Sequence, residues 1–140
     1  MRLSFLLLFS IFSFSCNFNS TSSDKIIEPG GYPYGDLFIN IFGDGKLIVC
    51  RNSDITSSLG TWNQRVENPF SELRFQFIEQ TKYSDKGKTD SVVLAIDSSE
   101  IWSVRKSEFG FHRFVHISGN TYEDHVLLRD YGPSTVCNFN

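Results

Sequence analysis

Residues 37–50, with the sequence LFINIFGDGKLIVC, decide the fold class. Two short runs of apolar and β-branched residues flank a glycine-rich centre, and such residues favour extended strands. Asp44-Gly45 can adopt the positive φ angles of a type I′ turn, so the two runs are predicted to form an antiparallel hairpin. With a two-residue turn, Ile41 lies opposite Ile48 and Ile39 lies opposite Cys50. The Cys50 side chain is therefore predicted to point into the core.

A second hairpin is predicted at residues 111–128, with the sequence FHRFVHISGNTYEDHVLL, around the turn signal Gly119-Asn120. Side chains alternate between the two faces of a strand, so one face of this hairpin is apolar and is predicted to pack in the core. That face carries Val115, Ile117, Tyr122, Val126 and Leu128, with Arg113 and Asp124 placed to neutralise each other. The opposite face gathers all three histidines of the chain and one carboxylate, namely His112, His116, His125 and Glu123.

The residues between the hairpins complete the fold prediction. Residues 70–81 suit either a helix capped by Asn68 or a strand whose inward side chains include Phe75 and Phe77. The strand is preferred, because a helix would leave Phe75 on its polar side. Residues 91–96, SVVLAI, are typical of a buried strand, and residues 101–104 continue as another. We therefore expect an all-β chain, a single antiparallel meander of about seven or eight short strands that closes as a small barrel or sandwich. The alternative is an α+β fold with one helix near residues 69–80.

The N-terminus is typical of an export signal. Met1-Arg2 is followed by the apolar residues 3–14, LSFLLLFSIFSF. This run is shorter than the ~20 residues that a membrane-spanning helix needs, but it has the length of the hydrophobic region of a signal peptide.

The residues that follow, Ser13-Phe14-Ser15-Cys16, resemble the lipobox of bacterial lipoproteins, in the relaxed form of spirochaete-type lipoproteins. The resemblance covers residues 1–16 only, and implies that Cys16 is acylated and that the chain is cleaved before it. The protein would then be anchored to a membrane of the cell envelope. The alternative is an ordinary secretory cleavage site, for which Ser13 and Ser15 are small enough, and Cys16 would then stay unmodified in a secreted protein.

These features divide the chain into three parts. Residues 1–15 form the signal peptide, residues 16–35 the lipidated cysteine and a flexible tether, and residues 36–140 a single β-rich domain. Without Arg2, which leaves with the signal, the mature chain has 12 basic and 16 acidic side chains, a net charge of −4. It has no basic block, so nucleic acid is not expected as a partner, and membrane attachment would depend on the lipid on Cys16. No cofactor is predicted.

The remaining cysteines form an even pair. If Cys16 carries lipid, Cys50 and Cys137 are left, and in an exported protein such a pair predicts a disulfide. The alternative is two separate thiols, one of them buried as a small apolar side chain.

The histidine face offers the chain's one candidate metal site. His116, Glu123 and His125 could present two nitrogens and one oxygen to Zn²⁺ or Cu²⁺. His112 lies four residues from His116 on a strand, ~13 Å away, so both cannot bind one ion. We favour the other interpretation, in which His116 and Glu123 form a surface pair worth less than ~1 kcal/mol.

No catalytic motif can be written for this sequence, so we expect a non-enzymatic binding or structural module at the cell envelope, with a protein or an envelope component as ligand. Tyr32, Tyr34 and Trp62 occupy loop-like stretches and are candidate contact residues, because aromatic residues dominate binding hot spots. The alternative is a small metal-binding or enzymatic secreted protein that uses His116, Glu123 and His125.

Overall fold

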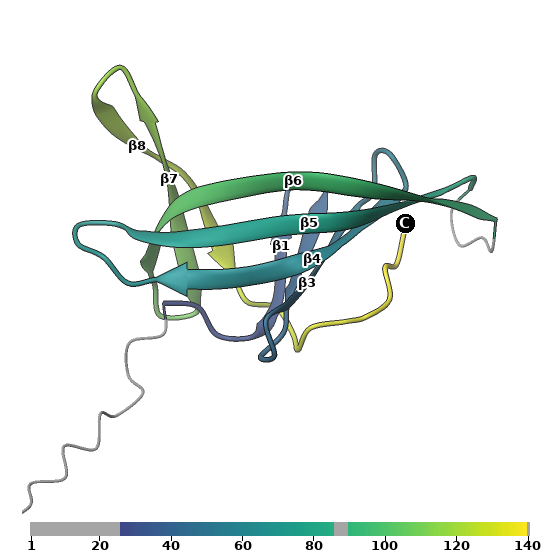
Figure 1. The fold of residues 1–140 in the computed structure, drawn as a ribbon. Coiled ribbons are helices and arrows are strands. Elements are labelled where there is room, and N and C mark those ends of the chain that lie inside the picture. Colours follow the sequence, from purple (N-terminus) through teal and green to yellow (C-terminus); the bar gives the residue numbers. More distant parts are fainter. Residues whose placement is uncertain (1–25, 86–89, 140) are drawn as a thin grey trace, which may run out of the picture.

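The computed structural model describes residues 26–85 and 90–139, and within them the chain forms eight strands and no helix. The strands are β1 (Gly30–Tyr34), β2 (Leu37–Ile41), β3 (Lys46–Arg51), β4 (Thr56–Arg65), β5 (Ser71–Tyr83), β6 (Ser91–Lys106), β7 (Gly110–Ile117) and β8 (Asn120–Leu128). They lie in one sheet in sequence order, each antiparallel to the next, and Figure 1 shows the sheet curled into a nearly closed barrel. The predicted all-β meander is confirmed in its barrel form. The alternative of a helix near residues 69–80 is wrong, because β5 occupies that stretch.

No helix in the described part of the chain is long and apolar enough to cross a membrane. The proposed signal peptide and Cys16 lie outside the described residues.

The domain begins earlier than residue 36, the boundary expected from the sequence. Strand β1 starts at Gly30, and Ile26 and Ile27 are already buried in the core. The backbone N–H groups of Ile26 and Ile27 both donate to Oε1 of Gln64, at 2.8 and 2.9 Å. This amide and the burial of two isoleucines hold the lead-in segment against the barrel, so the glycine- and proline-rich composition that suggested a flexible tether is misleading here.

The first hairpin has a different turn from the predicted one. The N–H of Phe42 donates to the carbonyl of Lys46, the N–H of Gly45 donates to that of Phe42, and Gly45 has a φ of 88°. This is a three-residue loop whose last residue is left-handed, the second common hairpin geometry. The change moves the register by one residue, so Cys50 lies opposite Phe38 and not opposite Ile39. Cys50 is buried, as expected, with 5% of its surface exposed, but it lies on the other face of β3 from the predicted one, next to Asn40.

The C-terminal segment crosses the outer face of the barrel as a strap (Figure 1). Cys50 and Cys137 lie at disulfide-bonding distance, with their Cα atoms 5.6 Å apart, which confirms the predicted pairing. A second anchor is Asn40, fully buried on β2, whose Oδ1 accepts a 2.8 Å hydrogen bond from the backbone N–H of Ser134. Near the end of the chain the Phe139 ring packs on Tyr83 at 5.2 Å between centroids.

The interior of the barrel is filled mainly by aromatic and branched aliphatic side chains. Tyr32 packs on Phe111 at 5.3 Å between ring centroids, and Phe75 meets Trp102 edge-on at 5.0 Å. Just after β8 the chain passes β1, where Gly31 donates to the carbonyl of Tyr131 and accepts from the N–H of Asp130. These two bonds join the first and last strands at one end of the barrel.

Strand β6 differs most from the prediction made from the sequence. The two strands expected between residues 91 and 104 are one strand of 16 residues. Residues 91–96 were predicted to be buried, but Val92, Val93 and Leu94 are 60%, 57% and 50% exposed. The reason is that β7 pairs only with Ser103 to Lys106, so no neighbouring strand covers the first part of β6 on that side.

The second hairpin is also shifted. Its turn is Ser118-Gly119, with φ angles of 51° and 80°, and Ile117 pairs with Asn120. The apolar face predicted to enter the core is largely exposed, including Ile117, Tyr122 and Leu128. Figure 1 shows the cause: the hairpin projects beyond the barrel, so that only its base reaches the core, through Phe111 and Leu127.

Replacing both Cys50 and Cys137 by serine is expected to lower the free energy of unfolding by up to about 4–5 kcal/mol, because the bridge closes a loop with a sequence separation of 87 residues. Urea unfolding at equilibrium measures the change, and the unmodified chain in reductant serves as a control that should match the variant. Equal unfolding midpoints with and without the bridge would contradict its stabilising role.

Candidate functional site

The residues of the proposed metal site do not come together. His116 shares hydrogen bonds with Thr121 and Ser103, at 2.9 and 3.0 Å, and Glu123 pairs with His112 at 3.1 Å between Nδ1 and Oε2. The pairing of His116 with Glu123, predicted from the sequence, is therefore wrong, because the turn lies one residue earlier than expected. Within the described residues, no group of three or more His, Cys, Asp or Glu side chains is arranged to hold a metal ion.

A bulge separates His125 from the other histidines. The register of the β7–β8 pair shifts between Arg113 and Phe114, so that Asp124 is an extra residue on β8 and Arg113 lies opposite His125. His125 then meets the ring of Tyr34 edge-on at 5.1 Å.

The three aromatic residues proposed as contacts lie on strands and not in loops. Tyr32 belongs to β1 and is 1% exposed, and its hydroxyl donates a 2.6 Å hydrogen bond to the Glu28 carbonyl. Burial, with a further contribution from Glu28, outweighs the effect of Arg129 and raises the pKa of Tyr32 to about 12, so this phenol stays neutral at physiological pH. Trp62, on β4, donates to the Phe42 carbonyl at 2.8 Å and packs on the edge of the core.

One concave surface is a groove inside the open part of the barrel, which we call the inner groove. Inward-facing side chains of β2 to β6 line it, and its volume is about 180 Å³. Its apolar lining consists of Leu37, Ile39, Val49, Phe75, Phe77, Ile96 and Trp102. Its polar lining includes Arg51, Ser58, Gln80, Ser98 and Glu100. Seven apolar and six polar side chains line the groove, a mixture that suits a ligand with both an apolar and a polar part.

Trp102 links the inner groove to a partly exposed polar cluster on β1, β7 and β8. Its Nε1 donates to Oε2 of Glu100 at 3.0 Å, and the Arg113 guanidinium stacks 4.2 Å from the centroid of the indole. Arg113 also donates to the Tyr34 hydroxyl at 2.8 Å and pairs with Asp124 at 3.3 Å, as the sequence predicted for Arg113 and Asp124. These contacts fix the orientation of the Trp102 ring.

Desolvation is the main reason that the pKa of Tyr34 is raised, and its hydrogen bond to Oδ2 of Asp124 adds to the effect. Tyr34 is therefore a neutral hydroxyl within this cluster, donating to Asp124 and accepting from Arg113.

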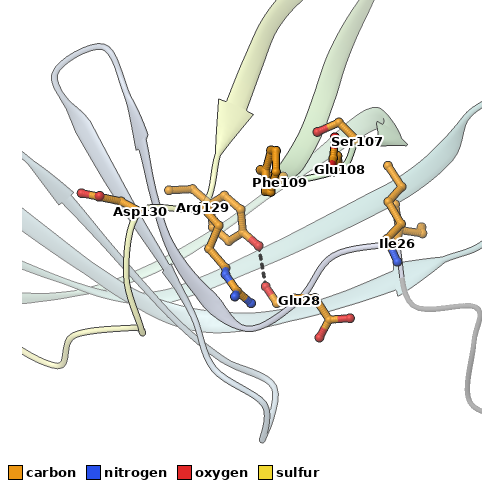
Figure 2. Close-up of a pocket in the computed structure, with 10 residues that line it drawn as sticks. Ile26, Glu28, Ser107, Glu108, Phe109, Arg129 and Asp130 are labelled. Carbon is orange, nitrogen blue, oxygen red and sulfur yellow. Dashed lines mark hydrogen bonds between the residues drawn. The ribbon is translucent and has the colours of Figure 1, made fainter.

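A second hollow, the basal pocket, lies at the end of the barrel where the described chain begins, and has a volume of about 230 Å³. Figure 2 shows the Arg129 side chain directed toward Glu28, with Ser107, Glu108 and Phe109 also lining the pocket. Charges of both signs are mixed here, since the cations Lys106 and Arg129 and the acids Glu28, Glu108 and Asp130 all line the pocket. The inner groove is the better candidate for a binding site, because its aromatic lining can bury an apolar ligand.

The sequence reasoning found part of the inner groove. It placed Phe75 and Phe77 on the inner face of a strand, which is correct. It missed Glu100 and Trp102, because it divided β6 into two segments. The signal was present: Ile96, Ser98, Glu100 and Trp102 alternate without a break, which indicates one strand with all four on one face.

No protein-family model matches the chain, and no match was found among curated proteins or among solved structures.

Proposed function

We propose that this protein is a non-enzymatic binding module of a cell envelope, anchored to a membrane by lipid on Cys16, and that it receives an apolar ligand in the inner groove. The observation that carries the proposal is the inner groove itself, where Phe75, Phe77 and Trp102 line an open concave surface inside a rigid barrel. Aromatic side chains supply a large apolar contact area at low entropic cost.

The position of the N-terminus supports the anchored arrangement. Ile26 is bound to Gln64, which pairs with Leu73 near the start of β5. The far end of β5 is Tyr83, ten positions along the strand, or roughly 33 Å at 3.3 Å per residue. The described chain therefore begins at the end of the barrel opposite Tyr83, so an anchor ahead of Ile26 would be attached away from the open end (Figure 1).

The groove chemistry favours binding over catalysis. Glu100 is the one acidic side chain that lines the inner groove, and it accepts a hydrogen bond from the Trp102 indole. The other lining side chains are the apolar residues named above together with Arg51 and uncharged polar residues, a set that suits recognition of an apolar group that carries polar substituents.

Lipid attachment is tested by the intact mass of the protein made from its full-length gene in a bacterium that processes lipoproteins. We expect a chain that lacks residues 1–15, carries acyl groups and fractionates with membranes, and a Cys16→Ser variant that has lost the acyl mass. An unmodified chain in the soluble fraction would contradict the anchor and make Cys16 an ordinary thiol.

Binding in the inner groove is tested with the neutral apolar dye N-phenyl-1-naphthylamine, whose fluorescence rises on transfer from water. We expect saturable binding that Ser98→Phe weakens about tenfold or more, because the new ring fills the groove opposite Phe77. Ser99→Phe is the matched control: Ser99 is the next residue of β6, pairs with Gln76 and faces the other side of the sheet. Equal affinities for the two variants, or no saturable binding, would contradict the proposed site.

A further inference from the structure

One edge of β6 is free over most of its length. The strand runs from Ser91 to Lys106, and β5 pairs with it on one side from Ser91 to Val104, with one register shift between Ala95 and Ser98. On the other side β7 pairs only with Ser103 to Lys106. Residues 91–102 therefore present an unpaired row of backbone N–H and C=O groups, as far as the described residues extend. Such an edge is a template for the addition of another strand.

This edge carries apolar side chains on both faces of the sheet. Leu94 lies opposite Gln80 and Val92 opposite Lys82, so both continue the inner face that Ile96 and Trp102 line. Val93 lies on the outer face and is 57% exposed. Exposed apolar residues clustered along an edge mark an interaction site.

Little of the usual protection of a free edge is present in this segment. Residues 91–96 contain no charged residue, no proline and no glycine, and the first charge along the strand is Asp97, where the pairing with β5 also shifts its register, between Ala95 and Ser98. Proteins that keep an edge unpaired place lysine, proline or a bulge on it. An edge of this composition is suited to pairing.

The segment complements a second copy of itself. In an antiparallel pair with its two-fold axis at Leu94, Val92 lies opposite Ile96, and Val93 lies opposite Ala95. Apolar side chains then meet apolar side chains on both faces, which is the arrangement that stabilises cross-strand pairs.

The charges select this register over its neighbours. With the axis at Leu94, Asp97 lies opposite Ser91, and Asp90 lies opposite Ser98. Moving the axis to Ala95 would set Asp90 opposite Glu100, two like charges, which is unfavourable. Moving it to Val93 would set the Asp90 carboxylate opposite Ile96. A shift of the pairing by one residue, or by any odd number, is excluded, because paired residues must lie on the same face of the sheet.

We propose that two copies of this chain join edge to edge through residues 91–97 of β6, antiparallel about a two-fold axis at Leu94, to form a dimer with one continuous sheet. The pairing uses the same segment on both chains, so the assembly closes at two copies. Val92, Leu94 and Ile96 of the two copies then form an apolar floor that joins the two inner grooves.

The mass of the purified protein in solution tests the dimer, measured by light scattering during size exclusion, with bound detergent subtracted if the chain carries acyl groups. We expect twice the mass of one chain, and a return to the single mass on Leu94→Lys, which places two like charges at the axis. Ile117→Lys is the matched control: it adds the same charge at an equally exposed apolar strand residue and should leave the dimer intact.

A single cysteine at the axis tests the register. Leu94→Cys places the two thiols opposite each other, within the Cα separation that a disulfide requires, so oxidation should cross-link the chains. Val93→Cys is the matched control, because Val93 faces Ala95 of the other copy and its own counterpart is a diagonal neighbour ~7–8 Å away.

Three results would overturn the proposal. A chain that stays monomeric at the highest soluble concentration would rule out pairing between two copies, and would indicate that the edge pairs with a strand of another protein. A dimer that survives Leu94→Lys would place the interface elsewhere. Assemblies larger than two copies that depend on Leu94 would contradict the closed two-fold pairing.

Discussion

Most of what is distinctive in this structure depends on the short contact between β6 and β7. The two strands pair over four residues only, although β6 is 16 residues long. The β7–β8 register shifts near that contact, at Arg113 and Phe114, and a bulge bends a strand and increases its twist. The hairpin therefore leaves the barrel (Figure 1), and both the inner groove and the free edge of β6 follow from this departure.

The other end of the barrel is held more firmly. There the first and last strands meet through the hydrogen bonds of Gly31, and the chain packs closely on the neighbouring glycine, since a Cβ on Gly30 would lie 2.5 Å from the Arg129 side chain and would force it to shift. Aromatic packing between Tyr32 and Phe111 fills the space inside, and the strap anchored at Cys137 crosses the outer face. A rigid base and an open far end suit a binding module, because the lining side chains are held in place before a ligand arrives.

The sequence was sufficient for the fold class and for the positions of both hairpins, but not for their registers. The turn at Gly45 takes three residues, and the turn at Ser118-Gly119 requires a left-handed serine, a conformation that composition does not indicate. A shift of one residue moves a side chain to the other face of a strand, which is why Cys50 was expected on the wrong face of β3. The pairing of Cys50 with Cys137 was still predicted correctly, because it rested on cysteine count and not on register.

The candidate site was predicted less well than the fold. An uninterrupted apolar run such as residues 91–96 is typical of a buried strand, but periodicity cannot show whether a neighbouring strand covers it. That depends on the length of β7, which pairs far from these residues in the sequence. The prediction that all three histidines share one face was wrong for a related reason. The extra residue at Asp124 turns His125 away from Glu123 and toward Tyr34.

Amide hydrogen exchange along β6, followed residue by residue by NMR in the dilute Leu94→Lys chain, tests the central claim most directly. The account predicts that in residues 91–102 alternate amides, those that point away from β5, exchange at nearly unprotected rates. Ser103 and Val104, which pair with both β5 and β7 at the base of the barrel, should both be protected. Uniform protection along the whole of β6 would contradict the account, because it would mean that the sheet closes beside this strand and leaves neither an open groove nor a free edge.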